Sequence, residues 1–263
     1  MSGRDEGRKG RRVSRRDLLK AGLAGAAAGL LPGSFLLPAL ADSRANRLNF
    51  ALVDHGAGPN PRPTALRRLA WEISRRTSIA AELDTAVIPL TDRRLFFHPF
   101  IVLAGEDAFP MPGEEAAANL RRHLTYGGTL LIDSTEGGDG SPFDTAVRSL
   151  VEQVLPGRPL VPIPRDHVLY KSFYLLEGPS GRVIRKPYLE GVFMDDRVAL
   201  VYSQNDLLGA WARDDLGLWE HEVEQHQRER AFRLGVNVVM YSMCLDYKDD
   251  QVHIPFILKR RRS

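Results

Sequence analysis

Four short apolar runs of the sequence each end in polar side chains of the kinds that bind ligands or transfer protons. These polar clusters are Asp54-His55-Gly56, Glu106-Asp107, Asp133-Ser134 and Ser203 to Asp206. If the runs are parallel strands, their carboxyl ends lie at one edge of a sheet, where open α/β proteins bind ligands. Asp, Ser and Gly also build ordinary strand-to-helix loops, so one such cluster alone is a weak signal. Their recurrence at four strand ends predicts a polar cleft at that edge.

A hydrolytic site is one hypothesis for this cleft, assembled from Asp54, Asp133, His167, Ser203 and Asp206. Asp133 or Asp206 would orient His167 through a hydrogen bond. His167 would then act as the general base that activates Ser203 or a water molecule. The residues after His167 include Leu169-Tyr170, and a histidine beside aromatic residues is more often half-buried and structural. Both roles of His167 therefore stay open at this level.

A binding cleft without catalysis is the second hypothesis. The residues expected to line it are Asp54, His55, Ser134, Asn205 and Trp211. Such a cleft would hold a small ligand, a glycan or a segment of a partner protein. Trp211 equally fits a position in the core.

Standard catalytic and cofactor motifs are missing from the sequence. It contains no G-x-S-x-G elbow, G-x-G-x-x-G loop or P-loop, so it specifies no cofactor. His221-Glu222 and His226 resemble a zinc-protease helix, but histidines five residues apart would lie about 140° apart around a helix. Cys244 is the single cysteine, which excludes an intramolecular disulfide and a cysteine-based metal cluster. Its apolar neighbours favour a buried, inert thiol. We expect no metal site.

The elements that would position the cleft residues alternate between strands and helices. The strands are expected at Leu48–Val53, Ala86–Leu90, Phe100–Ala104 and Thr129–Ile132, and the helices at about Thr64–Arg76, Pro112–Tyr126 and Ser141–Leu155. Thr64 is expected to cap the first of these helices. The alternation indicates a parallel sheet that is covered on both faces, and wholly apolar strands are typical of such a sheet.

The second half of the chain has a different pattern. Val183–Met194 and Arg197–Ser203 flank Asp195-Asp196, which predicts a hairpin that returns to the sheet. A last helix is expected over about Arg228–Leu245. Val252–Leu258 is predicted as a final edge strand, because Pro255 is tolerated only at a sheet edge.

The first 41 residues have the features of a secretory signal. A basic segment contains Arg15-Arg16 followed by Asp17-Leu18-Leu19-Lys20, and an uncharged stretch runs from Ala21 to an Ala39-Leu40-Ala41 cleavage site. The paired arginines identify the twin-arginine version, whose partner is the export machinery of that pathway. Residues 1–41 are therefore predicted to be a signal peptide, and residues 42–263 a single α/β domain in the periplasm. An uncleaved signal would instead anchor the domain to the membrane.

The charge of the chain is concentrated in this signal. Residues 1–41 contain eight Lys or Arg and three Asp or Glu, a net charge of +5, whereas the whole chain carries +3. The remaining domain therefore carries −2, which argues against nucleic-acid binding. The Lys259–Arg262 tail is short and is expected to be a solvated terminus.

Five segments of the chain resemble a known family. They are Pro61 to Glu72, Leu124 to Asp133, Asp166 to Tyr174, Tyr202 to Trp211 and Phe232 to Leu258. Together they resemble the bacterial domain of unknown function numbered 4159, over nearly all of the exported part. That family is similar to the class I glutamine amidotransferase-like and flavodoxin-like folds, so the resemblance implies a three-layer α/β fold with a mainly parallel sheet.

The resemblance does not imply glutaminase chemistry. That reaction needs a cysteine on a tight turn after a strand, together with a histidine. Here the fourth strand leads into Asp133-Ser134, and Cys244 belongs to the last predicted helix. Some relatives are domains of larger membrane-linked proteins, which favours a binding or assembly role with a membrane-associated partner.

Overall fold

The computed structural model describes residues 47–260, with side chains described up to Met243. Its centre is a seven-stranded sheet with the order β2-β1-β3-β4-β7-β6-β5. The strands are β1 (Phe50–Asp54), β2 (Ala86–Pro89), β3 (Phe100–Gly105), β4 (Thr129–Ser134), β5 (Val161–Pro162), β6 (Glu190–Met194) and β7 (Arg197–Ser203). β2, β1, β3, β4 and β7 are parallel, and β6 and β5 are antiparallel to the strands beside them. The expected α/β architecture with a mostly parallel sheet is confirmed.

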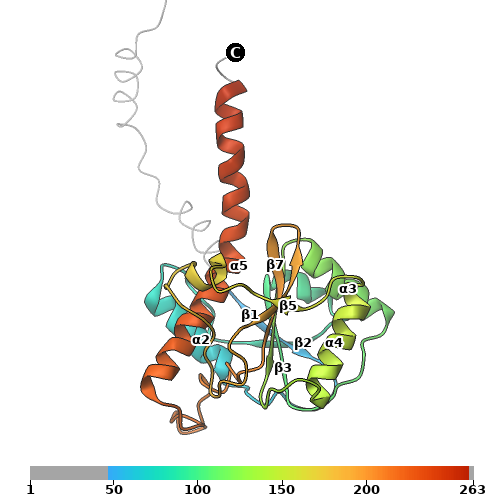
Figure 1. Cartoon of the computed structure of the whole chain (residues 1–263), viewed down its shortest axis with the longest axis vertical. Coiled ribbons are helices and arrows are strands. Elements are labelled where there is room, and N and C mark those ends of the chain that lie inside the picture. The colour runs from blue at the N-terminus through green and yellow to red at the C-terminus, as the bar shows by residue number, and fades with distance from the viewer. Residues whose placement is uncertain (1–46, 261–263) are drawn as a thin grey trace, which may run out of the picture. The chain divides into compact units, whose positions relative to one another are not determined.

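Helices cover both faces of this sheet (Figure 1). The helices are α2 (Ala65–Arg76), α3 (Glu114–Thr125), α4 (Pro142–Val154) and α5 (Gln225–Arg260), and short 3-10 turns are η1 (Arg93–Phe97) and η2 (Val168–Lys171). α2 and α5 pack on the strand residues typified by Leu52 and Val102, whereas α3 and α4 pack on the alternate residues typified by Val53 and Leu103. Alternation of side chains along each strand thus produces two apolar cores. This explains why β3 and β4 are apolar throughout most of their length.

Local signals in the sequence account for the ends of the helices. The Ser141 hydroxyl accepts a hydrogen bond from the Asp144 N–H at 3.1 Å, and Pro142 occupies the first turn of α4. α3 ends before Gly127, whose φ of 103° suits glycine. Thr64 precedes α2 as predicted, but its hydroxyl bonds the backbone of Arg213 instead of capping the helix.

Two predictions about the second half of the chain need correction. β6 begins at Glu190 instead of Val183, because residues 183–186 bond to Asn205 in a loop. The segment Val252–Leu258 lies within α5 and is not an edge strand. Extending an existing helix adds about one backbone hydrogen bond for each residue that carries an N–H, whereas a separate element would have to be nucleated anew. The hairpin turn at Asp195-Asp196 joins β6 to β7 as expected.

Candidate functional site

Asp133, at the end of β4, is fully buried. Its two carboxylate oxygens accept hydrogen bonds from the N–H groups of Leu207 and Leu208 at 2.9 and 2.8 Å. Burial, together with the charge of Asp206, raises the pKa of Asp133 to about 7. The carboxyl group therefore holds the chain that follows β7, and no part of it is open to solvent.

Asp206 is also fully buried and lies at the centre of an ion-pair cluster. Arg62 approaches it with Nη2 at 3.1 Å, and the Nε of Arg182 donates to the same oxygen. The second oxygen accepts the N–H of Gly209 at 3.0 Å. The backbone of Asp206 has a φ of 47°, a conformation that few residues other than glycine adopt. The surrounding bonds hold this residue in place and occupy its carboxylate.

The neighbouring polar groups are used in the same way. The Ser134 hydroxyl accepts the N–H of Gly137, and the Ser203 hydroxyl accepts the N–H of Asn205. The Asn205 side chain accepts two backbone N–H groups and donates to the carbonyl of Lys186. The sequence placed these residues correctly at strand ends, but the structure gives them loop-supporting bonds.

His167 lies at the opposite end of the sheet. Its ring contacts Tyr241 at 5.5 Å between centroids, and the Tyr241 hydroxyl accepts the N–H of Val198 near the start of β7. Ser203 is five residues further along that strand, a distance of roughly 16 Å. The Nδ1 of His167 accepts the N–H of Leu169, so the histidine caps the start of η2. The expected Ser/His/Asp arrangement is therefore corrected: His167 cannot reach Ser203.

Trp211 also needs correction as a binding residue. Its side chain is fully buried and stacks on Phe232 at 6.1 Å between ring centroids. A Cβ atom added to Gly235 would lie 2.5 Å from the indole, so α5 packs directly against it. The indole has no face left for a ligand.

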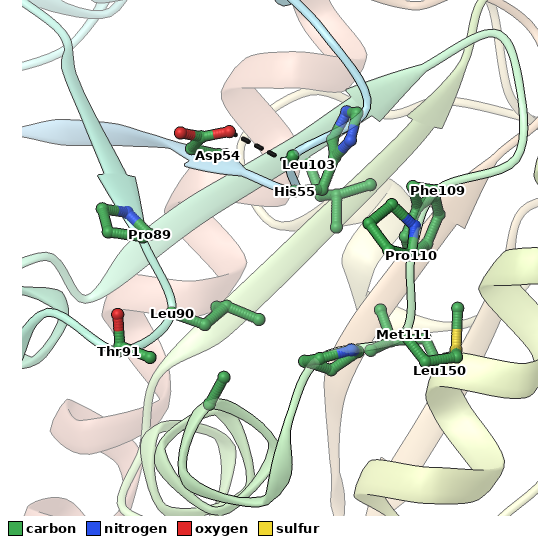
Figure 2. Close-up of a pocket in the computed structure, with 13 residues that line it drawn as sticks. Asp54, His55, Pro89, Leu90, Thr91, Leu103, Phe109, Pro110, Met111 and Leu150 are labelled. Carbon is green, nitrogen blue, oxygen red and sulfur yellow. Dashed lines mark hydrogen bonds between the residues drawn. The ribbon is translucent and has the colours of Figure 1, made fainter.

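A pocket lies at the carboxyl ends of β1, β2 and β3 (Figure 2). Its volume is about 280 Å³. Leu90 and Thr91 from one loop face Phe109, Pro110 and Met111 from another. Its further lining residues are Asp54, His55, Gly56, Pro89, Leu103, Pro112, Ala116 and Leu150. The structure thus brings Asp54 and His55 together at a largely apolar hollow and separates them from Asp133 and Asp206.

Hydrogen bonds fix the orientation of the two polar residues at this pocket. One carboxylate oxygen of Asp54 accepts the N–H of Gly56 at 3.0 Å, and the residue is exposed. The Nδ1 of His55 accepts the N–H of Ala57, which assigns the proton to Nε2. Nε2 then donates to the carbonyl of Ala104 at 3.2 Å. The ring is held at the end of β1, with its centroid 5.3 Å from that of the Phe109 ring.

The apolar half of this pocket was missed from the sequence. Phe109-Pro110-Met111-Pro112 lies in the loop that joins β3 to α3, and two large apolar side chains that alternate with prolines in a loop were the available signal. Met111 is 39% exposed, which is unusual for a residue that only fills a core. Within residues 47–243, no group of three or more His, Cys, Asp or Glu side chains is placed to hold a metal ion.

The fold and the pocket define the class of protein. It is a mostly parallel α/β domain with a pocket beyond the carboxyl ends of its strands, carried behind an export signal. The chain belongs to the family described as Domain of unknown function (DUF4159), whose model matches residues 49–243.

The signal matches its own model. Residues 12–32, which include Arg15 and Arg16, match the model of the twin-arginine translocation pathway signal sequence. The protein is therefore handled by the twin-arginine export machinery and carried across the membrane. A search of curated proteins finds no match to the chain. In the part of the chain that the structure describes, no helix is both long enough and apolar enough to cross a membrane.

Proposed function

We propose that this protein is a non-catalytic binding domain of the periplasm, and that the pocket at β1 and β3 holds its ligand. The observation that carries the proposal is the position of an open, apolar pocket at this point of the sheet. From β1 the chain passes to β2 on one side, and β3 lies on the other side of β1. Ligands of open α/β sheets bind where the strand order reverses in this way.

The strand order also supports a relation to the flavodoxin-like folds. The five parallel strands follow the order β2-β1-β3-β4-β7, which corresponds to the 2-1-3-4-5 order of those folds. We propose that the domain is also related to the glutamine amidotransferase-like folds.

The volume of the pocket limits the size of the ligand. Pockets for drug-sized ligands and cofactors span about 300–1,000 Å³. At about 280 Å³, this pocket is too small for a nucleotide and suits one apolar side chain of a partner polypeptide, or a molecule of that size.

The charge around the pocket indicates which charged group the ligand carries beside its apolar part. Asp54 is the acid among the thirteen lining residues, and these residues include no Lys or Arg. A ligand with a cationic group beside its apolar part therefore fits better than one with an anionic group there.

The buried and fully bonded states of Asp133 and Asp206 support binding over catalysis, because neither carboxyl group is available to a substrate.

The test compares two probes that share a phenylethyl group and carry opposite charges, 2-phenylethylamine and 3-phenylpropanoate, by calorimetric titration of the purified protein. We expect the amine to bind and the acid to bind more weakly. Ala116→Phe fills the pocket from α3 and should abolish binding. Asp54→Asn should reduce the affinity for the amine by about two- to fivefold, the range of an exposed ion pair.

Asp84→Asn is the matched control, because Asp84 is an exposed acid near the opposite end of β2. It should leave the affinity unchanged. Equal affinity for the two probes, or unchanged binding by the folded Ala116→Phe variant, would contradict the proposal.

A further inference from the structure

A second hollow, of about 510 Å³, lies beside the first half of α2. Its lining residues are Thr64, Arg67, Arg68, Trp71, Leu83, Arg213, Asp214, Asp215 and Gly217. None of these residues lines the pocket at β1 and β3. The hollow is within the size range of ligand sites. It brings together three arginines from two segments that are far apart in the sequence.

Tryptophan rings hold two of these arginines in place. The guanidinium of Arg68 lies 4.2 Å from the ring centroid of Trp71 and 5.5 Å from that of Trp219. The guanidinium of Arg213 lies 3.3 Å from the ring centroid of Trp219. Because both guanidiniums contact one indole, two cations are held close together at the wall of the hollow.

The donors of these two arginines are only partly satisfied. Arg68 donates to Glu72 and Arg213 donates to the carbonyl of Gly217. The Nε atom of each is buried and has no hydrogen-bond partner among the described residues. Burial lowers the pKa of Arg213, and the nearby charge of Arg68 acts in the same direction. An anionic group that accepts hydrogen bonds would offset the repulsion between these two cations.

The acids near the hollow do not neutralise the three arginines, because they are paired on α2, bonded within their own turn or exposed. Glu72 is shared between Arg68 and Arg76 on α2. One oxygen of Asp214 accepts the N–H groups of Leu216 and Leu218 and so supports its own turn. Asp215 is exposed at the rim.

Apolar surface adjoins the arginines. Trp71 and Leu83 both line the hollow, and each is 38% exposed. A flat or apolar body that enters beside the guanidiniums would cover this surface. The planar guanidinium fork matches the geometry of a carboxylate or a phosphate.

We propose that this hollow is an oxyanion site, which binds the carboxylate or phosphate of a ligand whose apolar part packs on Trp71 and Leu83. The proposal is independent of the pocket at β1 and β3.

The test uses the three tryptophans of the chain as reporters. Their indole N–H signals in a ¹H–¹⁵N NMR spectrum are assigned with Trp71→Phe and Trp219→Phe. The probes are inorganic phosphate, phenyl phosphate, benzoate and, as the control of opposite charge, benzylamine. We expect the phenyl phosphate and benzoate titrations to shift the signals of Trp71 and Trp219 and to leave the signal of buried Trp211 in place.

Phosphate and phenyl phosphate distinguish the two sources of the anion. A response to both assigns a site for the free anion, whereas a response to phenyl phosphate and benzoate alone assigns a site that also needs the apolar body; either supports an oxyanion site. Silence with all three anions, or equal shifts with benzylamine, would overturn it.

Variants then locate the charge. Arg213→Gln should weaken phenyl phosphate or benzoate binding by about tenfold or more, as expected for a hydrogen bond between charged groups. Arg67→Gln removes an exposed guanidinium of the same hollow and should also weaken binding without affecting the fold. Arg122→Gln removes the same charge from α3 on the other face of the sheet and should leave the affinity unchanged. Equal losses in Arg67→Gln and Arg122→Gln would contradict a local site.

Discussion

His123 should make the protein sensitive to acid. The residue lies on α3 and is only 4% exposed, and its Nε2 atom has no hydrogen-bond partner among the described residues. A Cβ atom added to Gly128 would lie 2.2 Å from that nitrogen, so the ring is tightly enclosed. Burial, with the nearby charges of Arg197 and His98, lowers the pKa of His123 from 6.5 to about 4. The folded protein therefore resists protonation of this ring.

The sign and size of the effect follow from the two pKa values. Between pH 6.5 and about 4, the unfolded chain binds a proton at His123 that the folded protein does not. The free energy of unfolding therefore falls as the pH falls through this window. Each unit of pKa difference corresponds to about 1.4 kcal/mol, so the loss at pH 4 is about 3 kcal/mol.

The assay is urea unfolding at about pH 7 and pH 4 for the natural protein and His123→Leu. The natural protein should lose about 3 kcal/mol more between the two pH values than the variant does. Asp133 has a raised pKa and acts in the opposite direction, but it is common to both proteins and cancels in the comparison. His226→Leu removes an exposed histidine and should keep the natural pH dependence. Equal losses in the natural protein and His123→Leu would show that His123 is not the source of the acid sensitivity.

Two further substitutions test the packing of the domain by urea unfolding. Asp206→Ala leaves two arginines beside an empty, buried position and should lower the free energy of unfolding by about 3–5 kcal/mol; a loss below about 1 kcal/mol would show that the ion pairs are not needed. Ser141→Ala removes the hydroxyl that caps α4 and should cost about 1 kcal/mol. Ser149→Ala, which removes a hydroxyl from the exposed surface of the same helix, is its control and should cost less than Ser141→Ala; the reverse order would contradict the assignment of the cap.

Most of the strands could be predicted because their signals are local. The apolar runs gave β3 and β7 to within one residue, since a strand buried on both faces needs apolar side chains at successive positions. Ser141-Pro142 marked the start of α4 because a capping hydroxyl and a proline in the first turn are also local signals. The start of β6 failed because its boundary depends on Asn205, which lies beyond the strand and holds residues 183–186 in a loop.

The candidate site was harder to predict because its chemistry depends on contacts between distant segments. The sequence placed Asp133 at a strand end, but its bonds to Leu207 and Leu208 form only when the chain after β7 folds back over β4. Likewise, the position of His167 depends on where η2 meets α5, which residue spacing does not determine. The signal at residues 12–32 was readable because a linear motif needs no fold.

The most direct measurement is the structure of the protein with 2-phenylethylamine bound. We expect the phenyl ring in the pocket between Leu103 and Met111, with the ammonium group toward Asp54. A phenyl ring bound elsewhere on the domain, with this pocket unchanged, would show that this pocket is not the ligand site.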